Sequence, residues 1–220
     1  MIDLWLVRHG ETDWNRELRF QGHLDAPLNG LGMQQAQRLG EHLARLQPRP
    51  LLASDLLRTR QTAEPLAGRW LTSAMPDSLW REQAFGVIEG LTFEEIKARH
   101  PEIVEGWRRH DPDFAPEGGE SRRQFHARVM QAVQALVERC RQEQWQSPVV
   151  VSHGGVLDMV YRSATGQSLG GPRECLIPNA GLNHVRTDGV RFEIVAWAQT
   201  DHLEGLPPSA VYPTASPSRA

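Results

Sequence analysis

An arginine and a histidine stand side by side in the stretch LVRHGET, which covers residues 6–12. The pair follows a short apolar run and precedes Gly10, so we expect both side chains at the end of a strand, where a ligand can reach them. The planar fork of an arginine matches phosphate oxygens, and a neutral histidine can act as a nucleophile. Arg8 and His9 therefore predict a site that binds an anion and attacks it.

The same two residue types follow two later apolar runs. The run Leu51–Ala53 is followed by SDLLR, which ends in Arg58, and the run Val149–Val151 is followed by Ser152 and His153. Ligands of open α/β sheets bind at the carboxyl ends of parallel strands, so we expect these arginines and histidines to converge on one pocket.

Gly154 and Gly155 follow His153 and should open a helix, whose first backbone N–H groups can also bind an anion. The combination predicts phosphoryl transfer. Since the sequence contains neither a Walker-type phosphate loop nor carboxylates spaced for magnesium, we expect no metal and no cofactor.

Alternating strands and helices must hold these residues in place. The apolar runs predict strands over Ile2–Val7, Leu51–Ala53 and Pro148–Ser152, and a hairpin over Val185–Trp197 that turns at Asp188-Gly189. We predict an α/β fold of three layers, with a mainly parallel central sheet, helices on both faces and a C-terminal antiparallel hairpin. A single domain is expected over residues 1–205, and a mostly disordered tail over residues 206–220.

Besides the helix opened by Gly154, four helices are predicted between the strands. One follows Asn29 and ends at Pro48, and one runs from the capping residues Ser54 and Asp55 to about Trp70, with a kink or loosening at Pro65. Two more begin at the capping-box patterns of Thr92 and Ser121, on either side of a loop over His110–Gly119. The inward faces of the first and last helices are expected to comprise Leu31, Ala36, Leu39, Leu43, Leu46, Phe125, Val129, Val133, Leu136 and Cys140.

The composition limits the partners of the chain. Its 220 residues include 24 basic and 27 acidic ones, for a net charge of −3, so no broad basic surface for nucleic acid is expected. Cys140 and Cys175 lie far apart in the sequence, and neither a signal peptide nor a membrane-spanning run is expected. We therefore expect a cytoplasmic protein that binds a small phosphomonoester, without nucleic-acid or membrane partners, and leave a homodimer open.

Four segments together resemble one known family. LVRHGETDWN, SDLLRTRQTA, REQAFGVIEG and VVVSHGG are similar, in this order, to motifs of the histidine phosphatase superfamily, also called the phosphoglycerate-mutase-like fold. The resemblance covers residue 2 to about residue 197. The triplet RHG alone is a weak match, but the combination of segments is highly specific.

The resemblance implies a phosphohistidine mechanism. His9 matches the nucleophile, whereas Arg8, Arg58, His153 and Asn15 match residues that bind the phosphoryl oxygens. Glu82 matches the general acid, which protonates the leaving oxygen and then, once deprotonated, activates water. The charge of the adjacent arginine should lower the pKa of His9 and keep its ring neutral.

Specificity is expected to come from the loops Gln21–Leu24 and His110–Gly119. We assign Gln21, Gly22 and Gly154 to substrate binding.

Glu89 lies seven residues beyond Glu82 in a similar local setting, and it remains the alternative for the general acid. The other histidines, His23 among them, are expected at surface or loop positions, with His184 the most apt to reach the pocket.

Two reactions of the family fit the sequence. Only 27 residues separate Gly90 from Gly118, where the phosphoglycerate mutases that we compare carry a longer insertion that shields phosphohistidine from water. This favours a phosphomonoesterase acting on a small metabolite over a 2,3-bisphosphoglycerate-dependent mutase, and a non-catalytic phospho-ligand module is the third hypothesis. Val87 and Ile88 replace an Asp-Trp pair often seen in the phosphatase motif, so the substrate is left open.

Overall fold

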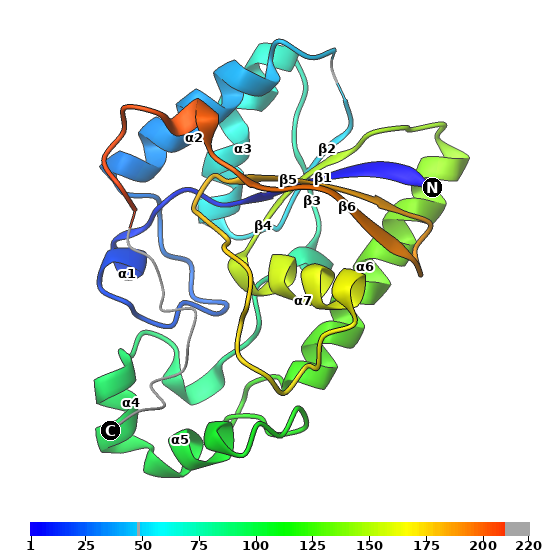
Figure 1. The fold of residues 1–220 in the computed structure, drawn as a ribbon. Helices are drawn as coiled ribbons and strands as arrows, with labels where there is room; N and C mark the ends of the chain where they lie inside the picture. The colour runs from blue at the N-terminus through cyan, green and yellow to red at the C-terminus, as the bar shows by residue number, and fades with distance from the viewer. Residues whose placement is uncertain (48, 210–220) are drawn as a thin grey trace.

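The computed structural model describes residues 1–47 and 49–209 (Figure 1). Pro48, the predicted end of the first long helix, and residues 210–220 of the predicted tail lie outside the described residues. Just before that tail segment, the Gln35 amide donates a hydrogen bond to Ser209 Oγ, at 2.6 Å. In the part of the chain that is described, every helix is too short or too polar to cross a membrane.

A six-stranded sheet forms the centre of the molecule. Its order is β3-β2-β4-β1-β5-β6, and its strands are β1 (Ile2–Arg8), β2 (Leu51–Ala53), β3 (Met75–Pro76), β4 (Val149–Ser152), β5 (Leu182–Thr187) and β6 (Phe192–Gln199). The first four strands in this order pair in parallel, whereas β1–β5 and β5–β6 are antiparallel. The mainly parallel sheet with an antiparallel C-terminal hairpin is thus confirmed.

Helices cover both faces of the sheet, as predicted (Figure 1). The helices α2 (Gly30–Leu43) and α3 (Leu57–Trp70) lie on one face, and α6 (Arg122–Gln142) and α7 (Gly154–Thr165) lie on the other. Each face has its own apolar cluster. One cluster joins β1, β2 and β4 to α2 and α3, and the other joins β1 and β4 to α6 and α7.

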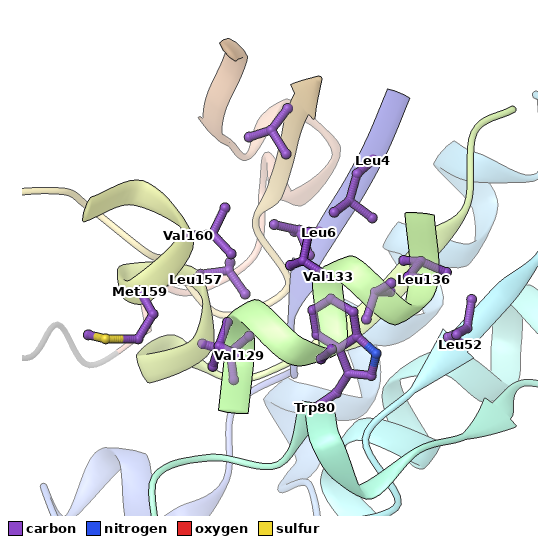
Figure 2. Packing of buried hydrophobic residues seen from close by; sticks show 14 of the residues in the cluster. Leu4, Leu6, Leu52, Trp80, Val129, Val133, Leu136, Leu157, Met159 and Val160 are labelled. Carbon is purple, nitrogen blue, oxygen red and sulfur yellow. The ribbon is translucent and has the colours of Figure 1, made fainter. Parts of the chain in front are cut away.

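The cluster beneath α6 illustrates the agreement between sequence pattern and packing. Ser121 caps α6 through the predicted capping box. The predicted inward residues of this helix, from Phe125 to Cys140, are all buried. Trp80 belongs to the same apolar cluster as Val133 of α6 and the β1 residue Leu6, as Figure 2 shows.

Short helices complete the fold between the larger elements. They are α1 (Asp13–Arg16), η1 (Ser78–Trp80), η2 (Gly86–Ile88), α4 (Phe93–Arg99), α5 (Pro101–Arg108) and η3 (Asp201–Leu203). Thr92 caps α4 through the predicted capping box, but α5 begins directly afterwards at Pro101 and was not predicted. The helices α4 and α5 share a small apolar cluster that includes Ile88, Ile96 and Ile103.

Two helix boundaries differ from the prediction. Ser54 and Asp55 do not cap α3, whose N-cap is Leu56. The Ser54 N–H still pairs with Val151 O of β4. Pro65 lies inside α3 without ending it and packs against Gly40 of α2. At the other boundary α2 ends at Leu43, so Leu46 lies beyond the helix and is 37% exposed instead of facing inward.

Candidate active site

The site forms where two neighbouring parallel strands end. Arg8 is the last residue of β1 and lies opposite Ser152, the last residue of β4. The His9 N–H continues this pairing by donating to Ser152 O at 2.9 Å. His9 and His153, the residues that directly follow the two strands, therefore lie side by side, with ring centroids 5.3 Å apart.

The ring of His9 has a defined orientation. Its Nδ1 lies 2.7 Å from Gly10 O, and since a carbonyl can only accept, Nδ1 carries the proton and Nε2 carries the lone pair. Burial, together with the charges of Arg58 and Arg8, holds the pKa of His9 well below 6.5. The expected neutral imidazole is thus supported, although burial contributes more to the lowered pKa than the adjacent arginine does.

Backbone contacts fix the position of His9. Asn179 Nδ2 donates to His9 O at 3.0 Å, and the Gly10 N–H donates to Thr62 Oγ1 at 2.9 Å. Asn179 and Thr62 were not predicted. Neither follows an apolar run that reads as a strand, so the pattern that pointed to Arg8 and His153 gave no signal for them.

His153 is a fully buried imidazole without a hydrogen-bond partner on either nitrogen among the described residues. Burial is the main cause, and the charge of Arg58 the next, that lowers the pKa of His153 well below 6.5, so the ring is neutral. A buried polar group without a partner costs free energy. An oxygen of a bound anion beside His9 would accept the proton of this ring and remove that cost.

Arg8 and Arg58 approach the two histidines from different elements. Arg8 Nη1 donates to Ile177 O at 2.7 Å. Arg58, at the start of α3, is fully buried, and burial lowers its pKa to about 10, which leaves it protonated at neutral pH. Two guanidinium groups thus provide positive charge where an anion would bind.

Arg58 also positions the predicted specificity loop. Its Nη2 donates to Gly22 O at 2.8 Å and its Nη1 to Leu24 O at 2.9 Å, while its buried Nε has no partner among the described residues. Gly22 adopts φ +52°, a conformation that favours glycine. Gln21 is 6% exposed, and its Oε1 is buried without a partner in the described chain.

Asn15 lies beneath the loop that follows His9. Its Oδ1 accepts from the Thr12 N–H at 3.1 Å, within the capping box of α1. The same oxygen accepts from Asn179 Nδ2 at 3.3 Å. This network assigns the oxygen and the nitrogen of the amide. The amide nitrogen is then the end of Asn15 that can donate to a ligand.

The two candidate acids occupy different environments. Glu82 Oε2 accepts the Gly155 N–H at 3.0 Å and its Oε1 accepts the Gln83 N–H at 2.9 Å, so its carboxylate lies at the N-terminus of α7. Glu89 instead accepts the N–H groups of Phe85, His23 and Leu24, at 2.9–3.1 Å. Glu89 therefore acts as a brace for the loop at Gly22, which favours Glu82 as the carboxylate available to a substrate.

His23 lies in a loop, as expected, but it also contacts the site, whereas His184 does not reach it. His23 lies against the site, with Nε2 2.9 Å from Glu82 O, and its position next to Gly22 in the specificity loop was the available signal. The prediction that His184 reaches the pocket is wrong. Antiparallel pairing sets His184 opposite Trp5, on which it stacks at 4.2 Å, and its Nε2 bonds Asp3 Oδ1 at 2.7 Å, near the far end of β1.

Other parts of the surface are separate from this site. A hollow of about 520 Å³ lies between α2 and η3 and is lined by residues that include His42, Asp201 and His202. None of the residues at the ends of β1 and β4 contributes to it. Within residues 1–47 and 49–209, no group of three or more His, Cys, Asp or Glu side chains could hold a metal ion.

Comparison with known proteins gives a consistent family. The sequence profile of the histidine phosphatase superfamily (branch 1) matches residues 4–200. Phosphoglycerate mutase-like protein 4 of Arabidopsis thaliana is 35% identical over 207 residues, which are 92% of this chain and 87% of that protein. The probable phosphoglycerate mutase GpmB of Salmonella paratyphi C is 34% identical over 189 residues, 84% of this chain and 85% of that protein.

A solved structure of similar sequence has the same fold. The mycobacterial glucosyl-3-phosphoglycerate phosphatase, in complex with VO3, matches with a TM-score of 0.76 and 32% sequence identity. The match covers 91% of this chain and 100% of that chain.

Proposed function

The chain belongs to the histidine phosphatase superfamily, and on that basis we propose that it hydrolyses a small phosphomonoester through a phosphohistidine on His9. The orientation of the His9 ring carries this proposal. Nδ1 is occupied by Gly10 O, and the pKa is well below 6.5, so a neutral Nε2 with a free lone pair is available near neutral pH. That is the state a nitrogen nucleophile requires.

In the proposed first step, His9 Nε2 attacks the phosphorus in line with the leaving oxygen. A nitrogen–phosphorus bond forms as the ester phosphorus–oxygen bond breaks. Arg8, Arg58 and His153 bind the three non-bridging oxygens, where charge must be stabilised in the transition state. The unpartnered ring of His153 and the buried, unpartnered Nε of Arg58 support this role, and the Asn15 amide is a further donor.

Glu82 supplies the proton in this scheme. Its carboxyl group protonates the leaving oxygen, and the resulting carboxylate then takes a proton from a water molecule that attacks phosphohistidine. Inorganic phosphate leaves, and His9 returns to its neutral form. The position of Glu82 at the N-terminus of α7, beside His153, supports the assignment.

A phosphoglycerate mutase is the second candidate, because the two sequence relatives described above carry mutase names. The short segment that forms α4 and α5 favours the phosphatase. With less chain to cover the phosphoenzyme, water reaches phosphohistidine more readily. Hydrolysis is then favoured over transfer of the phosphoryl group to a second acceptor.

One assay separates these functions. Purified protein is given 3-phosphoglycerate with a trace of 2,3-bisphosphoglycerate, and both free phosphate and 2-phosphoglycerate are measured. Release of phosphate supports the phosphatase, whereas formation of 2-phosphoglycerate supports the mutase. A panel of other phosphomonoesters accompanies the assay, and no turnover of any of them would favour a non-catalytic phospho-ligand module.

The proposed chemistry uses arginine and histidine charges instead of a metal. We therefore expect that EDTA leaves phosphate release unchanged. A large loss of activity that magnesium or zinc restores would contradict the mechanism.

A further inference from the structure

A third arginine borders the site from the segment that joins α7 to β5. A Cβ atom built on Gly154 would lie 3.5 Å from Arg8 Nε and 3.7 Å from Arg173 Nη1. Both guanidinium groups therefore face the same glycine, in the first turn of α7. The N–H of Gly155, the next residue, donates a hydrogen bond to the Glu82 carboxylate. Arg173 thus lies beside the proposed phosphate clamp and near the proposed acid.

Two arginines, the half-buried Arg122 and the buried Arg162, hold the chain just before Arg173. Arg122 Nη1 donates to Leu169 O at 2.9 Å and to Gly171 O at 2.7 Å. Arg162 donates to Ser168 O, and its Nη2 donates to Gly171 O at 3.1 Å and Pro172 O at 2.7 Å. Backbone held by so many charge-assisted bonds has little freedom. The residue that follows it, Arg173, is therefore presented from a fixed position.

Arg173 keeps most of its capacity to bind an anion. Its ion-pair partner among the described residues is Asp158 Oδ1, at 3.7 Å. The same carboxylate pairs more closely with Arg162, at 3.0 Å, so one negative charge is shared between two guanidinium groups. The Arg173 side chain is 31% exposed, whereas Arg162 is buried. Arg173 is therefore accessible from solvent, whereas Arg162 is not.

We propose that Arg173 is a specificity-determining residue that binds a second anionic group of the substrate, a carboxylate or a second phosphate. This inference rests on the proposed function for the identity of the first group, the phosphomonoester at His9. The second group would lie on the leaving portion of the substrate, at the side of Gly154 where Arg8 and Arg173 meet. Arg173 would select acidic phosphomonoesters over neutral ones without taking part in the chemical step.

Matched substrates test the proposal by kinetics. 3-Phosphoglycerate and glycerol 3-phosphate differ only in a carboxylate in place of a hydroxymethyl group, and 1,3-propanediol bisphosphate is compared with propyl phosphate for the phosphate case. We expect Arg173→Gln to lower kcat/KM about tenfold for the acidic member of at least one pair, through KM, and less than twofold for the neutral member. Arg173→Lys should retain part of the preference because it keeps the charge.

Arg186→Gln is the control. Arg186 is also partly exposed and also pairs with one aspartate, Asp3 at 3.2 Å, but it lies on β5 away from the site. This variant should keep the wild-type preference. Equal losses on acidic and neutral substrates for Arg173→Gln, or a loss confined to kcat, would overturn the assignment.

Binding to a variant that cannot form phosphohistidine separates this inference from the proposed function. Calorimetric titration of His9→Ala protein with the same four compounds should show tighter binding of an acidic member, and adding Arg173→Gln should remove the difference. If the wild type hydrolyses none of the compounds but this difference persists, the proposed function fails and the role of Arg173 stands. If hydrolysis occurs without any Arg173-dependent preference, the role of Arg173 is wrong.

Discussion

At His9 the direction of a single hydrogen bond decides which ring nitrogen can react. Because Nδ1–H donates to Gly10 O, the lone pair of Nε2 is directed away from the backbone. The charges of Arg58 and Arg8 reinforce the effect of burial and disfavour a protonated ring. The same two arginines that would bind the phosphate thus also keep the nucleophile reactive.

We expect His9→Ala to abolish phosphate release while leaving the fold intact, since the substitution removes the attacking nitrogen. Rapid quenching of the wild type with radiolabelled substrate should trap an acid-labile, base-stable phosphoryl adduct that the variant lacks. Circular dichroism provides the control for folding. Full activity of a folded His9→Ala protein would remove His9 from the mechanism.

Glu82 and Glu89 form a matched pair for testing the general acid. A general acid contributes about 10²–10⁴-fold, and more when the leaving group is a poor one. We expect Glu82→Gln to slow an alkyl phosphomonoester far more than p-nitrophenyl phosphate, whose leaving group needs no proton. Steady-state kinetics on the two substrates measures this difference.

Glu89→Gln should show no dependence on the leaving group, because its carboxylate is held by three backbone N–H groups of neighbouring loops. The reverse pattern, with the dependence at Glu89, would exchange the two roles. Equal losses on both substrates for Glu82→Gln would point to phosphate binding or to dephosphorylation of His9.

Among the elements, the first turn of α2 is packed directly against the segment that carries His9. A Cβ atom on Gly10 would come within 2.6 Å of Gly32 O, and one on Gly32 would overlap Glu11 O. The Glu11 side chain also accepts from Asn29 Nδ2, at 2.9 Å, so the residue that caps α2 is tied to the same segment. Two glycines without Cβ atoms therefore set the distance between α2 and the active-site loop.

Gly32→Ala should destabilise the protein by about 1–3 kcal/mol, because the new methyl group must displace backbone. Phosphate release should also fall, since the displaced segment carries His9. Gly30→Ala is the matched control two residues earlier in α2, where nothing lies within 4 Å of the added Cβ. It should be neutral or stabilising by up to about 1 kcal/mol, as Ala favours a helix over Gly. Urea denaturation measures the free energy of unfolding of both variants. Equal changes for Gly32→Ala and Gly30→Ala would contradict the packing of α2 against the active-site loop.

For the whole molecule, the buried histidines couple stability to pH. His9 and His153 have pKa values well below 6.5 in the folded protein, mainly because of burial. Well above pH 6.5 both rings are neutral in the folded and the unfolded states, so they contribute no pH dependence. As the pH falls below 6.5 the unfolded chain takes up protons that the folded protein does not, and the free energy of unfolding decreases.

We expect a loss of about 1.4 kcal/mol per pH unit for each of these histidines once the pH lies well below 6.5 and above their folded pKa values. Urea denaturation at pH 7.5, 6.5 and 5.5 measures the free energy of unfolding. His153→Gln should make the decrease between pH 6.5 and 5.5 shallower, because one titrating group is gone. An unchanged slope in this variant would show that His153 is not held neutral by the fold.

The sequence by itself determined the strand ends, the layers and the arginines and histidines that gather at one edge of the sheet. Apolar runs such as Val149–Val151 are local signals, and the residue after a parallel strand must lie at the same edge as its counterparts. This reasoning predicts that Arg8, His9, Arg58 and His153 lie at one edge of the sheet. The capping boxes of Ser121 and Thr92 were predictable for a similar reason, since their hydrogen bonds join residues only three apart.

Only the tertiary structure decided which loop residues face the site. Glu82 and Glu89 lie in similar local sequence, but one carboxylate reaches the N-terminus of α7 and the other braces the loop at Gly22. The prediction for His184 is wrong because its position depends on strand pairing. No signal in the sequence indicates Arg173, because its position depends on a loop held by Arg122 and Arg162. Such contacts join residues far apart in the chain, so no periodicity or spacing in the sequence encodes them.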